Sequence, residues 1–467
     1  MRMPRSPLDD AAEGTRTTGG PRLRRQSSAD QVAAHVRQSI MAGELRRGDR
    51  LRQDEIAEEL GVSRIPIREA IIALDREGWV SSEANRGAFV TGLGADDIRD
   101  HYELRGLVLG LVARRVGETA TDPEIADLAK RHRAMQQAAD IASFSALNER
   151  LLARLLVLAD SPRLRAALLV TPSILPTGFF DVVPAGREIQ AKGIGRLVRL
   201  LKAHRSDDAE PLMRATLRQH GDAVVDAFGE SGLLRDVGPS DALERLEAVS
   251  GPPARVGETS AGAVASYVRK LIFDGRLDAG QRLPQDEIAV AVGVSRIPVR
   301  EAIISLEREG WLRVENHRGA FVLPLDERAI TDRFALYGRF HGFAARRAIE
   351  RMHPPDLEPL DALAQDVHRA TSPAAMERAN TGYQTTLVGF AGSNRLRAVL
   401  RSMLPIVPGS FFAAVPNSIP VAKRGIAAVH AAIVARDVDA AEQAFIDAQG
   451  RQAKGVIAMR RRRHRRS

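Results

Sequence analysis

The chain carries the stretch DEIAEELGVSRIPIREAI at residues 54–71, and it carries nearly the same stretch again, DEIAVAVGVSRIPVREAI, at residues 286–303. Fourteen of the 18 positions are identical, and the second copy follows the first by 232 residues. The same offset relates RGAFV at 86–90 to RGAFV at 318–322 and, much farther along, GFF at 178–180 to SFF at 410–412. One register held over so long a distance indicates a tandem duplication.

The repeated stretch is typical of two short helices joined by a tight turn. Asp54 to Leu60 predict the first helix, Gly61-Val62 predict the turn, and Ser63 is placed as the N-cap of a second helix that admits Pro66 in its first turn. This arrangement is a helix-turn-helix. Three apolar side chains of the second helix are expected to face the core: Ile71, Ile72 and Leu74.

A β-hairpin is predicted directly after the second helix. Trp79-Val80 and Ala88 to Val90 have the composition of strands, and Asn85-Arg86-Gly87 is typical of the turn between them. An amphipathic helix is predicted upstream, because apolar residues recur at intervals of four across 32–40. Together these elements predict a winged helix-turn-helix in each half of the chain.

In a helix-turn-helix the N-terminal residues of the second helix enter the major groove of double-stranded DNA. An arginine there can donate two hydrogen bonds to guanine, and an isoleucine can contact a thymine methyl. A solvated surface charge is the alternative for any single arginine, but the recurrence of the arrangement favours DNA binding. The candidate DNA-binding residues are Ser63, Arg64, Ile65, Pro66, Arg68, Arg86 and Gly87 in the first half and Ser295, Arg296, Ile297, Pro298, Arg300, Arg318 and Gly319 in the second.

These motifs, in this order, resemble the winged helix-turn-helix of the GntR family of bacterial regulators. The resemblance rests on LGVSRIPIREAI at 60–71, EGWV at 77–80 and RGAFV at 86–90. It implies that 63–68 lie on the recognition helix and that Arg86 and Gly87 form the wing tip. Many relatives place an arginine at the start of the preceding helix, where this chain has Asp54 and Asp286. A carboxylate repels phosphates, so we expect that contact to be lost.

The remainder of each half has helical periodicity and long runs rich in Leu and Ala. In GntR relatives of the FCD branch, this position holds a six- or seven-helix bundle that binds a small carboxylate, often through a metal. The segments YELRGL at 102–107 and ARDVDAA at 435–441 resemble that domain. The resemblance implies a helical regulatory domain and an effector of the organic-acid class.

The metal site of that domain is not expected in this chain. FCD sites use an Asp, a His four residues later and two further His, but the aligned positions lack these carboxylate and imidazole donors. They hold Asn148, Leu152, Ile194 and Thr216 in the first half and Asn380, Gln384, Ile426 and Ala448 in the second. We therefore expect no metal and no other cofactor. His204, His220 and His430 are expected to be surface or core residues.

The resemblance also suggests two effector-binding residues. Arg105 would meet a ligand carboxylate, and its counterpart in the second half is Tyr337. The alternative for Arg105 is a salt bridge with Glu103 or another nearby carboxylate.

Composition excludes several classes of protein. The 467 residues include no cysteine, which excludes disulfides and thiol catalysis. No apolar run approaches the roughly 20 residues of a membrane span, and the N-terminus has no signal-peptide pattern. Phosphate-binding glycine loops and the motifs of metalloproteases and serine hydrolases are absent, so an enzyme is not expected. We expect a cytoplasmic, nucleoid-associated protein that does not contact membranes.

The net charge of +9 favours a polyanionic partner, and part of the excess is concentrated at the two ends. These arginines are either solvated, disordered tails or additional contacts to phosphate. The fold class is mainly α, with two winged helix-turn-helix domains alternating with two all-α bundles. The expected boundaries are a basic N-terminal segment at 1–28, a DNA-binding domain at 29–93, a regulatory domain at 94–232, a linker at 233–260, a second DNA-binding domain at 261–325, a second regulatory domain at 326–459 and an Arg-rich tail at 460–467.

Two DNA-binding modules on one chain suggest an intramolecular pseudo-dimer. Ordinary dimers of this kind read half-sites about one helical turn apart, roughly 34–36 Å, and a covalent duplication supplies both recognition helices at high effective concentration. We expect a sequence-specific regulator of a pseudo-palindromic operator, and a repressor by the habit of the family. The alternative is a nucleoid-associated protein that coats DNA with little sequence preference. The sequence leaves open whether two chains form a homodimer.

Overall fold

The computed structural model describes most of the chain beyond its N-terminal segment. The described residues are 28–46, 48–76, 79–83, 87–90, 94–169, 171, 179–230, 234, 260–315, 318–403 and 406–464. The basic segment at 1–27 and nearly all of the linker expected at 233–260 lie outside them.

The first DNA-binding module is a winged helix-turn-helix, as the sequence predicts. Its elements are α1 (Ser28–Met41), α2 (Gln53–Leu60), α3 (Arg64–Arg76), β1 (Val80–Glu83) and β2 (Gly87–Val90). The two strands are antiparallel, with Val80 opposite Val90. Ile67, Leu74 and Trp79 are buried in the core between helices and wing. The prediction for Ile72 is wrong, because this side chain is 51% exposed on the outer face of α3.

The second module repeats this architecture. It contains α12 (Ser260–Phe273), α13 (Gln285–Val292), α14 (Arg296–Arg308), β3 (Leu312–Glu315) and β4 (Gly319–Val322). The register of its hairpin is the same, with Leu312 opposite Val322. In both modules a glycine with positive φ ends the helix before the turn, Gly61 at 62° and Gly293 at 72°. The left-handed conformation favours glycine there, because a Cβ would be strained.

The first regulatory domain is entirely helical. It contains α4 (Ala95–Thr119), α5 (Asp122–Gln136), α6 (Ile141–Ala159), α7 (Pro162–Leu169), α8 (Phe179–Val182), α9 (Pro184–Lys202) and α10 (Ser206–Glu230). Helices α4 and α10 pack along much of their length. Gly110 makes this close approach possible, since a Cβ there would lie 3.0 Å from the backbone oxygen of Glu210.

The second regulatory domain has the same order of elements. It contains α15 (Glu327–Arg351), the 3-10 turn η1 (Pro354–Asp356), α16 (Leu357–Arg369), α17 (Pro373–Ala391), α18 (Asn394–Ser402), α19 (Phe411–Ala414), α20 (Ser418–Val434) and α21 (Val438–His464). Helix α21 extends into the arginine run that was expected to be a tail. Arg460 donates a hydrogen bond to the carbonyl oxygen of Leu325 at 2.6 Å, so the start of the run packs against the protein.

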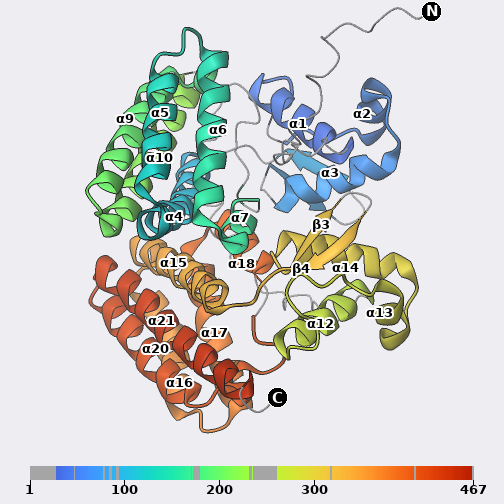
Figure 1. The fold of residues 1–467 in the computed structure, drawn as a ribbon, viewed down its shortest axis with the longest axis vertical. Coiled ribbons are helices and arrows are strands. Elements are labelled where there is room, and N and C mark those ends of the chain that lie inside the picture. The colour runs from blue at the N-terminus through green and yellow to red at the C-terminus, as the bar shows by residue number, and fades with distance from the viewer. Residues whose placement is uncertain are drawn as a thin grey trace, which may run out of the picture.

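The two DNA-binding modules lie on one side of the molecule and the two regulatory bundles on the other (Figure 1). Helices α7 and α18, which occupy equivalent places in the two halves, lie at the centre. Each packs against the opposite half: α7 contacts α14 and α15, and α18 contacts α3 and α4. The halves are therefore crossed, so that each regulatory domain touches the other half's DNA-binding module.

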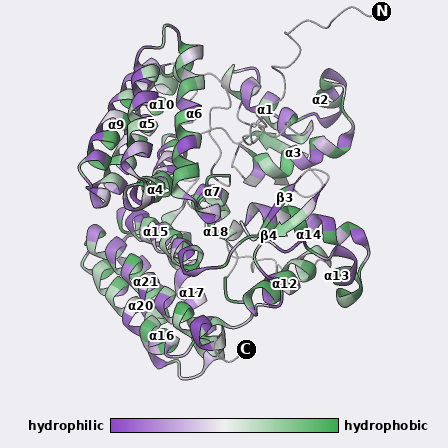
Figure 2. Ribbon diagram, in the orientation of Figure 1, coloured by the Kyte–Doolittle hydropathy of each residue, from purple (hydrophilic) through white to green (hydrophobic). Residues whose placement is uncertain are grey.

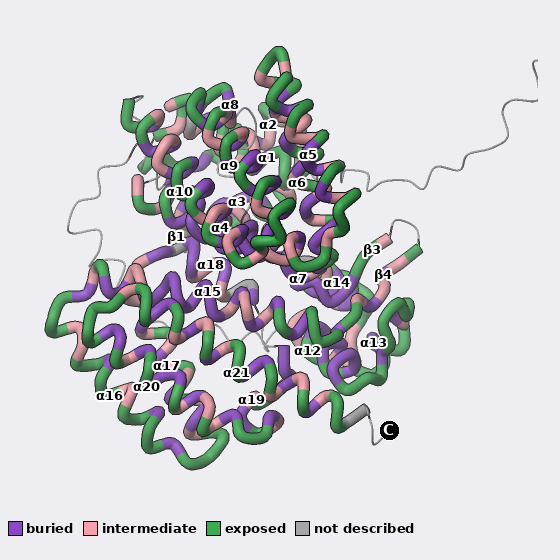
Figure 3. The backbone as a smooth tube through the Cα atoms, turned by 60° about the vertical axis from the view of Figure 1, so that its left-hand side comes forward, coloured by how far each residue is buried: buried purple, intermediate pink, exposed green. Residues whose placement is uncertain are grey.

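Apolar surfaces join the halves into one body. Hydropathy alternates around most helices (Figure 2), and buried residues follow α15 and α18 where the halves meet (Figure 3). Leu336, Phe340, Leu396 and Val399 of the second half belong to the same hydrophobic core as the first module and the first bundle. The burial of such side chains is the main stabilising contribution to this contact.

Two buried ion pairs also cross between the halves. Asp332 of the second half pairs with Arg115 of the first, and Ser161 donates a hydrogen bond to the same carboxylate at 2.6 Å. At the equivalent positions, Asp100 of the first half lies 2.9 Å from Arg347 of the second.

A serine completes each cluster. Ser161 and Ser393 stand at the N-termini of α7 and α18, where their hydroxyl oxygens accept hydrogen bonds from backbone N–H groups three residues on, both at 3.2 Å. Ser393 also hydrogen-bonds to Asp100, as Ser161 does to Asp332. Reciprocal contacts between equivalent residues are the mark of a two-fold interface. The chain is thus arranged internally like a dimer.

Candidate nucleic-acid interface and effector pocket

The N-terminal turn of each recognition helix presents its predicted DNA-binding residues to solvent. At the start of α3, Arg64, Ile65 and Arg68 and the preceding Ser63 are exposed and Pro66 is partly exposed, whereas Ile67 on the opposite face is fully buried. The equivalent residues of α14 have the same pattern, and Ile65 and Ile297 are 70% and 68% exposed. Large apolar side chains so exposed are suited to contact with base methyl groups.

An aspartate holds the leading arginine of each recognition helix. Arg64 Nε lies 2.9 Å from Asp54 Oδ1, and Arg296 Nε lies 2.8 Å from Asp286 Oδ1. All four side chains are more than two-thirds exposed, so each pair adds little to stability. The aspartates that were expected only to repel phosphate therefore also orient the arginines.

The N-cap of the second recognition helix leaves its hydroxyl without a capping hydrogen bond. Ser295 occupies the N-cap position of α14 with extended backbone, but its side chain makes no capping hydrogen bond. The hydroxyl is exposed at the end of the helix that would face DNA. It is therefore available to a phosphate oxygen, together with the positive end of the helix dipole.

Both predicted DNA-binding residues of the wing, Arg318 and Gly319, are described only in the second module. Arg318 is 74% exposed, pairs with Glu315 at 2.8 Å and lies over the ring of Phe321. Gly319 has a φ of +104°, and Gly87 has the equivalent φ of +106°. Arg86, the predicted tip of the first wing, lies outside the described residues.

Sequence reasoning missed one arginine at the base of each wing. Arg50 forms an isolated β-bridge with Phe89, and Arg282 forms the equivalent bridge with Phe321, so the backbone of each arginine pairs with the edge of its wing. The φ of +106° at Gly87 would strain any residue with a Cβ, and a Cβ there would also lie 3.0 Å from Arg50 Nε. The segment before α2 looked like a simple connector, because a single bridging residue leaves no period-two pattern. Both arginines are exposed beside the wing.

A buried arginine connects the first regulatory domain to the second DNA-binding module. Arg163 of α7 donates a hydrogen bond to the carbonyl oxygen of Glu309 at 2.7 Å, and its guanidinium lies 4.3 Å from the ring centre of Trp311. Burial lowers the pKa of Arg163 to about 9. Trp311 packs in the core of the second module. Arg163 thereby joins α7 to the core of that module.

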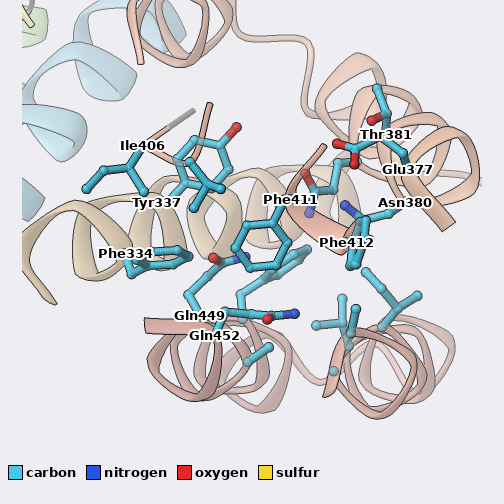
Figure 4. A pocket seen from close by; sticks show the side chains of 18 of the residues that line it. Phe334, Tyr337, Glu377, Asn380, Thr381, Ile406, Phe411, Phe412, Gln449 and Gln452 are labelled. Atoms are coloured by element: carbon cyan, nitrogen blue, oxygen red, sulfur yellow. The ribbon is translucent and has the colours of Figure 1, made fainter. Parts of the chain in front are cut away.

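The second regulatory domain contains a pocket with a volume of about 210 Å³. Its walls come from α15, α17, α19, α20, α21 and the segment after α18. Figure 4 shows Glu377, Asn380 and Thr381 gathered at one end, while Phe334 and Ile406 lie at the other. Phe334 and Ile406 belong to the hydrophobic core that includes the second DNA-binding module. A ligand in this pocket would therefore touch side chains of the regulatory domain that are packed continuously with the core of that module.

The four positions aligned with the family's metal ligands do line this pocket. Asn380, Gln384, Ile426 and Ala448 form part of its wall. Two neutral amides and two aliphatic groups do not fit a divalent cation, which prefers carboxylate, imidazole or thiolate donors. In the described parts of the chain, no three His, Asp or Glu residues cluster with metal-binding geometry.

Tyr337 lines the pocket of the second domain, whereas its counterpart Arg105 has a backbone partner. Arg105 is partly buried and donates a hydrogen bond to the carbonyl oxygen of Thr171 at 2.7 Å. The salt bridge with Glu103 suggested by the sequence is not what the structure contains. Glu103 pairs instead with Arg214 and Arg218.

The histidines have varied surroundings. His204 is exposed, His220 is buried against Phe179 with ring centres 5.2 Å apart, and His430 lies 2.8 Å from Asp361. Burial lowers the pKa of His220, and that of His341 beside the pocket, to about 4 in each case. Both are therefore neutral at physiological pH.

Comparison with known proteins gives consistent matches in both halves. The model of the gntR family of bacterial regulatory proteins matches residues 28–90 and 260–322, and that of the FCD domain matches residues 100–220 and 334–447. An uncharacterized HTH-type transcriptional regulator of Mycobacterium tuberculosis is 29% identical over 210 residues, which cover 44% of this chain and 84% of the relative.

Two further matches have the same character. The gluconate operon transcriptional repressor of Bacillus licheniformis is 35% identical over 108 residues, covering 23% of this chain and 44% of that protein. A solved GntR family regulator from Pseudomonas syringae is 23% identical and covers 48% of this chain and 96% of its own, with a TM-score of 0.26. Among the described helices, none has both the length and the apolarity that a bilayer crossing requires.

Proposed function

Because this chain belongs to the GntR family of bacterial transcriptional regulators, with an FCD domain in each half, we propose that it reads a pseudo-palindromic operator with both of its own DNA-binding modules. The recognition residues of α3 and α14 are nearly identical, so the two half-sites are nearly identical as well. Relatives that carry a functional name include operon repressors. Repression by occupancy of the operator is the mode of action that we propose.

The reciprocal contacts between the halves are the observation that carries this proposal. The pairs Arg115–Asp332 and Arg347–Asp100 relate the halves as a two-fold axis relates two subunits. Such an arrangement orients the two recognition helices inversely, as inverted half-sites require. One chain then provides what two chains provide in an ordinary dimer.

The DNA-contacting residues in this proposal are those exposed at the start of each recognition helix and on each wing. Arg64 and Arg296 read bases or clamp phosphates, and Arg318 of the second wing contacts the backbone or minor groove. Arg50 and Arg282 add a phosphate contact beside each wing. Because the target is DNA, we place the protein in the cytoplasm at the nucleoid.

The regulatory domains are proposed to sense a small molecule and to hold the modules in place. The pocket that includes Tyr337 adjoins the second module's core, so an occupant can change that module's position. In the first domain Arg105 is the candidate for ligand contact, and it would have to exchange the carbonyl of Thr171 for a ligand carboxylate.

A competition experiment separates this function from non-specific coating of DNA. Genomic fragments selected by the purified chain should yield one inverted-repeat motif, bound at least about 10³-fold more tightly than random duplex. A coating protein would instead bind all duplexes with similar affinity and a steep dependence on salt. A specificity ratio near one would reject the proposal.

A further inference from the structure

The two DNA-binding modules differ in charge, although their recognition helices are nearly identical. Residues 28–90 and residues 260–322 each contain nine Lys and Arg residues, but the first module contains eleven Asp and Glu residues and the second contains eight. With histidine neutral, the net charge is −2 for the first module and +1 for the second. Because DNA is a polyanion, the second module attracts it more strongly than the first does.

Two of the additional acidic residues lie on α2, the helix next to the recognition helix. Glu58 and Glu59 are exposed there, and the equivalent residues of α13, Val290 and Ala291, are exposed as well. Val290 is 83% exposed, so a valine at this position adds nothing to the core. The two helices therefore differ in the charge of an exposed surface and not in packing.

This surface of α2 lies close to the expected path of the DNA. The ion pair between Asp54 and Arg64 joins the start of α2 to the N-terminal turn of α3, which carries the base-reading residues. Glu58 follows Asp54 by four residues, so it lies on the same side of α2, about 6 Å along the helix. The first helix of a helix-turn-helix crosses the DNA backbone. Carboxylates there repel phosphates that lie within a Debye length, about 8–10 Å at physiological salt.

Arginines near these positions do not remove the difference. In the first module Arg52 precedes α2, but Glu55 lies 2.8 Å from its guanidinium and offsets its charge. In the second wing Arg313 and Arg318 share one carboxylate, that of Glu315, at 2.7 and 2.8 Å. These three residues have a net positive charge, and the first wing has a serine at the position of Arg313.

A basic face of α21 adds to the same asymmetry. Four exposed side chains follow one side of the last turns of this helix: Arg451, Lys454, Arg461 and Arg462. The equivalent side of α10 carries three acidic residues: Asp222, Asp226 and Glu230. One ion pair with a neighbouring helix on each face leaves the sign of that face unchanged. Arg460 lies 5.8 Å from the ring centre of Phe273 in α12, so the basic face is attached to the second module.

We propose that the two DNA-binding modules of this chain are unequal: the second module, together with the basic face of α21, engages DNA first and more tightly, and the acidic α2 makes the first module the weaker one. The proposal rests on the reading of DNA by both modules proposed above. A strong and a weak module on one chain hold a complete operator by their combined affinity. The weak module alone does not retain the chain on an isolated half-site.

A short duplex that contains a single half-site measures each module separately in the full chain. Arg64→Ala disables the first module and Arg296→Ala disables the second, and the changes are matched because each arginine pairs with an aspartate. We expect the Arg296→Ala chain to bind this duplex about 10-fold more weakly than the Arg64→Ala chain, since three charges each contribute a few tenths of a kcal/mol. Equal affinities, or the reverse order, would overturn the proposal.

Neutralisation of α2 identifies the cause of the difference. In the Arg296→Ala chain, Glu58→Gln with Glu59→Gln should raise the affinity for the half-site duplex by about 3–10-fold. Asp207→Asn with Asp208→Asn, near the start of α10 in the regulatory domain, removes the same charge and should leave the affinity unchanged. An equal gain from both pairs would mean that the total charge of the chain sets the affinity, which would overturn the proposal.

The reciprocal change tests the second module. In the Arg64→Ala chain, Val290→Glu with Ala291→Glu should lower the affinity by about the same factor without lowering the melting temperature, because both positions are exposed. Arg461→Gln with Arg462→Gln should weaken this chain and leave the Arg296→Ala chain unchanged. If the two chains lose affinity equally, the basic face does not belong to the second module and that part of the proposal is rejected.

The same titrations on a random duplex of equal length separate this proposal from the reading of an operator. If genomic selection yields no motif, operator reading fails, and the order of the two modules is decided on the random duplex alone. If a motif is selected and both modules bind its half-site equally, only the inequality fails. A stronger second module on both duplexes supports the proposal.

Discussion

Arg347 of α15 lies 2.9 Å from Asp100 of α4, so a guanidinium from the second half of the chain neutralises a buried carboxylate of the first. In the equivalent pair the two halves exchange roles: Arg115 comes from the first half and Asp332 from the second. Both aspartates are almost fully buried. An uncompensated charge at such a position is strongly unfavourable, so these pairs determine which arrangement of the two halves is stable.

Removal of Arg347 should therefore destabilise the whole chain. We expect Arg347→Met to lower the free energy of unfolding by about 3–5 kcal/mol, because the buried carboxyl of Asp100 loses its main cationic partner. The double variant Arg347→Met with Asp100→Leu should recover much of this loss, since it removes both charges. Arg369→Met, on an exposed pair with Asp366, is the control and should change stability by less than about 1 kcal/mol. Denaturant unfolding measures all three, and equal losses for Arg347 and Arg369 would contradict the interpretation.

Stability should fall in mild acid because three histidines, His101, His220 and His341, are buried and have a lowered pKa. The pKa of His220 and of His341 is about 4 in the folded chain, below the ordinary 6.5, so the unfolded chain takes up their protons first. Their contribution to the free energy of unfolding is complete above about pH 6.5 and is lost as the pH falls to about 4. The loss is up to about 3 kcal/mol for each histidine. Asp100 acts in the opposite sense. Burial raises its pKa to about 6, so the folded chain takes up this proton before the unfolded chain does, and the free energy of unfolding gains from it as the pH falls below about 6.

Replacement of one histidine isolates this effect from the aspartates. His341→Phe keeps a ring beside Phe445 but cannot take up a proton. Unfolding measured between pH 4 and pH 7 should show a shallower pH dependence for this variant than for the native chain. Parallel curves would show that His341 does not contribute.

The aspartates of the first helix of each motif should restrain non-specific binding. Asp54→Asn with Asp286→Asn removes two repulsive charges and releases Arg64 and Arg296 from their ion pairs. We expect affinity for random duplex to rise by about 3–10-fold, on the order of 1 kcal/mol, with a steeper dependence on salt. Asp207→Asn, at an exposed position near the start of helix α10 in the regulatory domain, should have no effect. A fall in affinity for random DNA would mean that the aspartates assist phosphate contact.

The contact through Arg163 should stabilise one DNA-binding module selectively. Arg163→Leu removes a charge-assisted hydrogen bond to Glu309 and the stacking on Trp311, together about 2–4 kcal/mol of local stability. Hydrogen exchange should increase in β3 and β4 but not in β1 and β2. Arg395→Leu, at the equivalent position, should have the reverse pattern. Equal exchange in both wings for both variants would contradict the crossed arrangement.

The modules could be predicted from the sequence because their signals are local. Glycine at the turn, proline in the first helical turn and a strand–turn–strand pattern each arise from a few neighbouring residues, and the structure confirms these elements. Ile72 was misplaced because apolar character alone does not distinguish a core position from an exposed one next to it. Arg50 was missed because a single bridging residue has no periodic pattern.

The relation between the halves could not be predicted in the same way. Ser161 and Arg163 carry no mark that their partners are Asp332 and Glu309, more than 140 residues away. Duplicated sequences show which residues are equivalent, but a contact within one half and a contact between halves leave the same sequence pattern. The pocket was also hidden, since its lining residues come from five helices and a connecting segment that are separated in the sequence.

The most direct test of the central claim is native mass spectrometry of the chain on a duplex that contains one selected operator, combined with footprinting of the same complex. The account predicts one chain per duplex and two protected half-sites, with Arg64→Ala weakening protection of one half-site and Arg296→Ala weakening the other. Two chains per operator, or protection of both half-sites unchanged by either substitution, would contradict it.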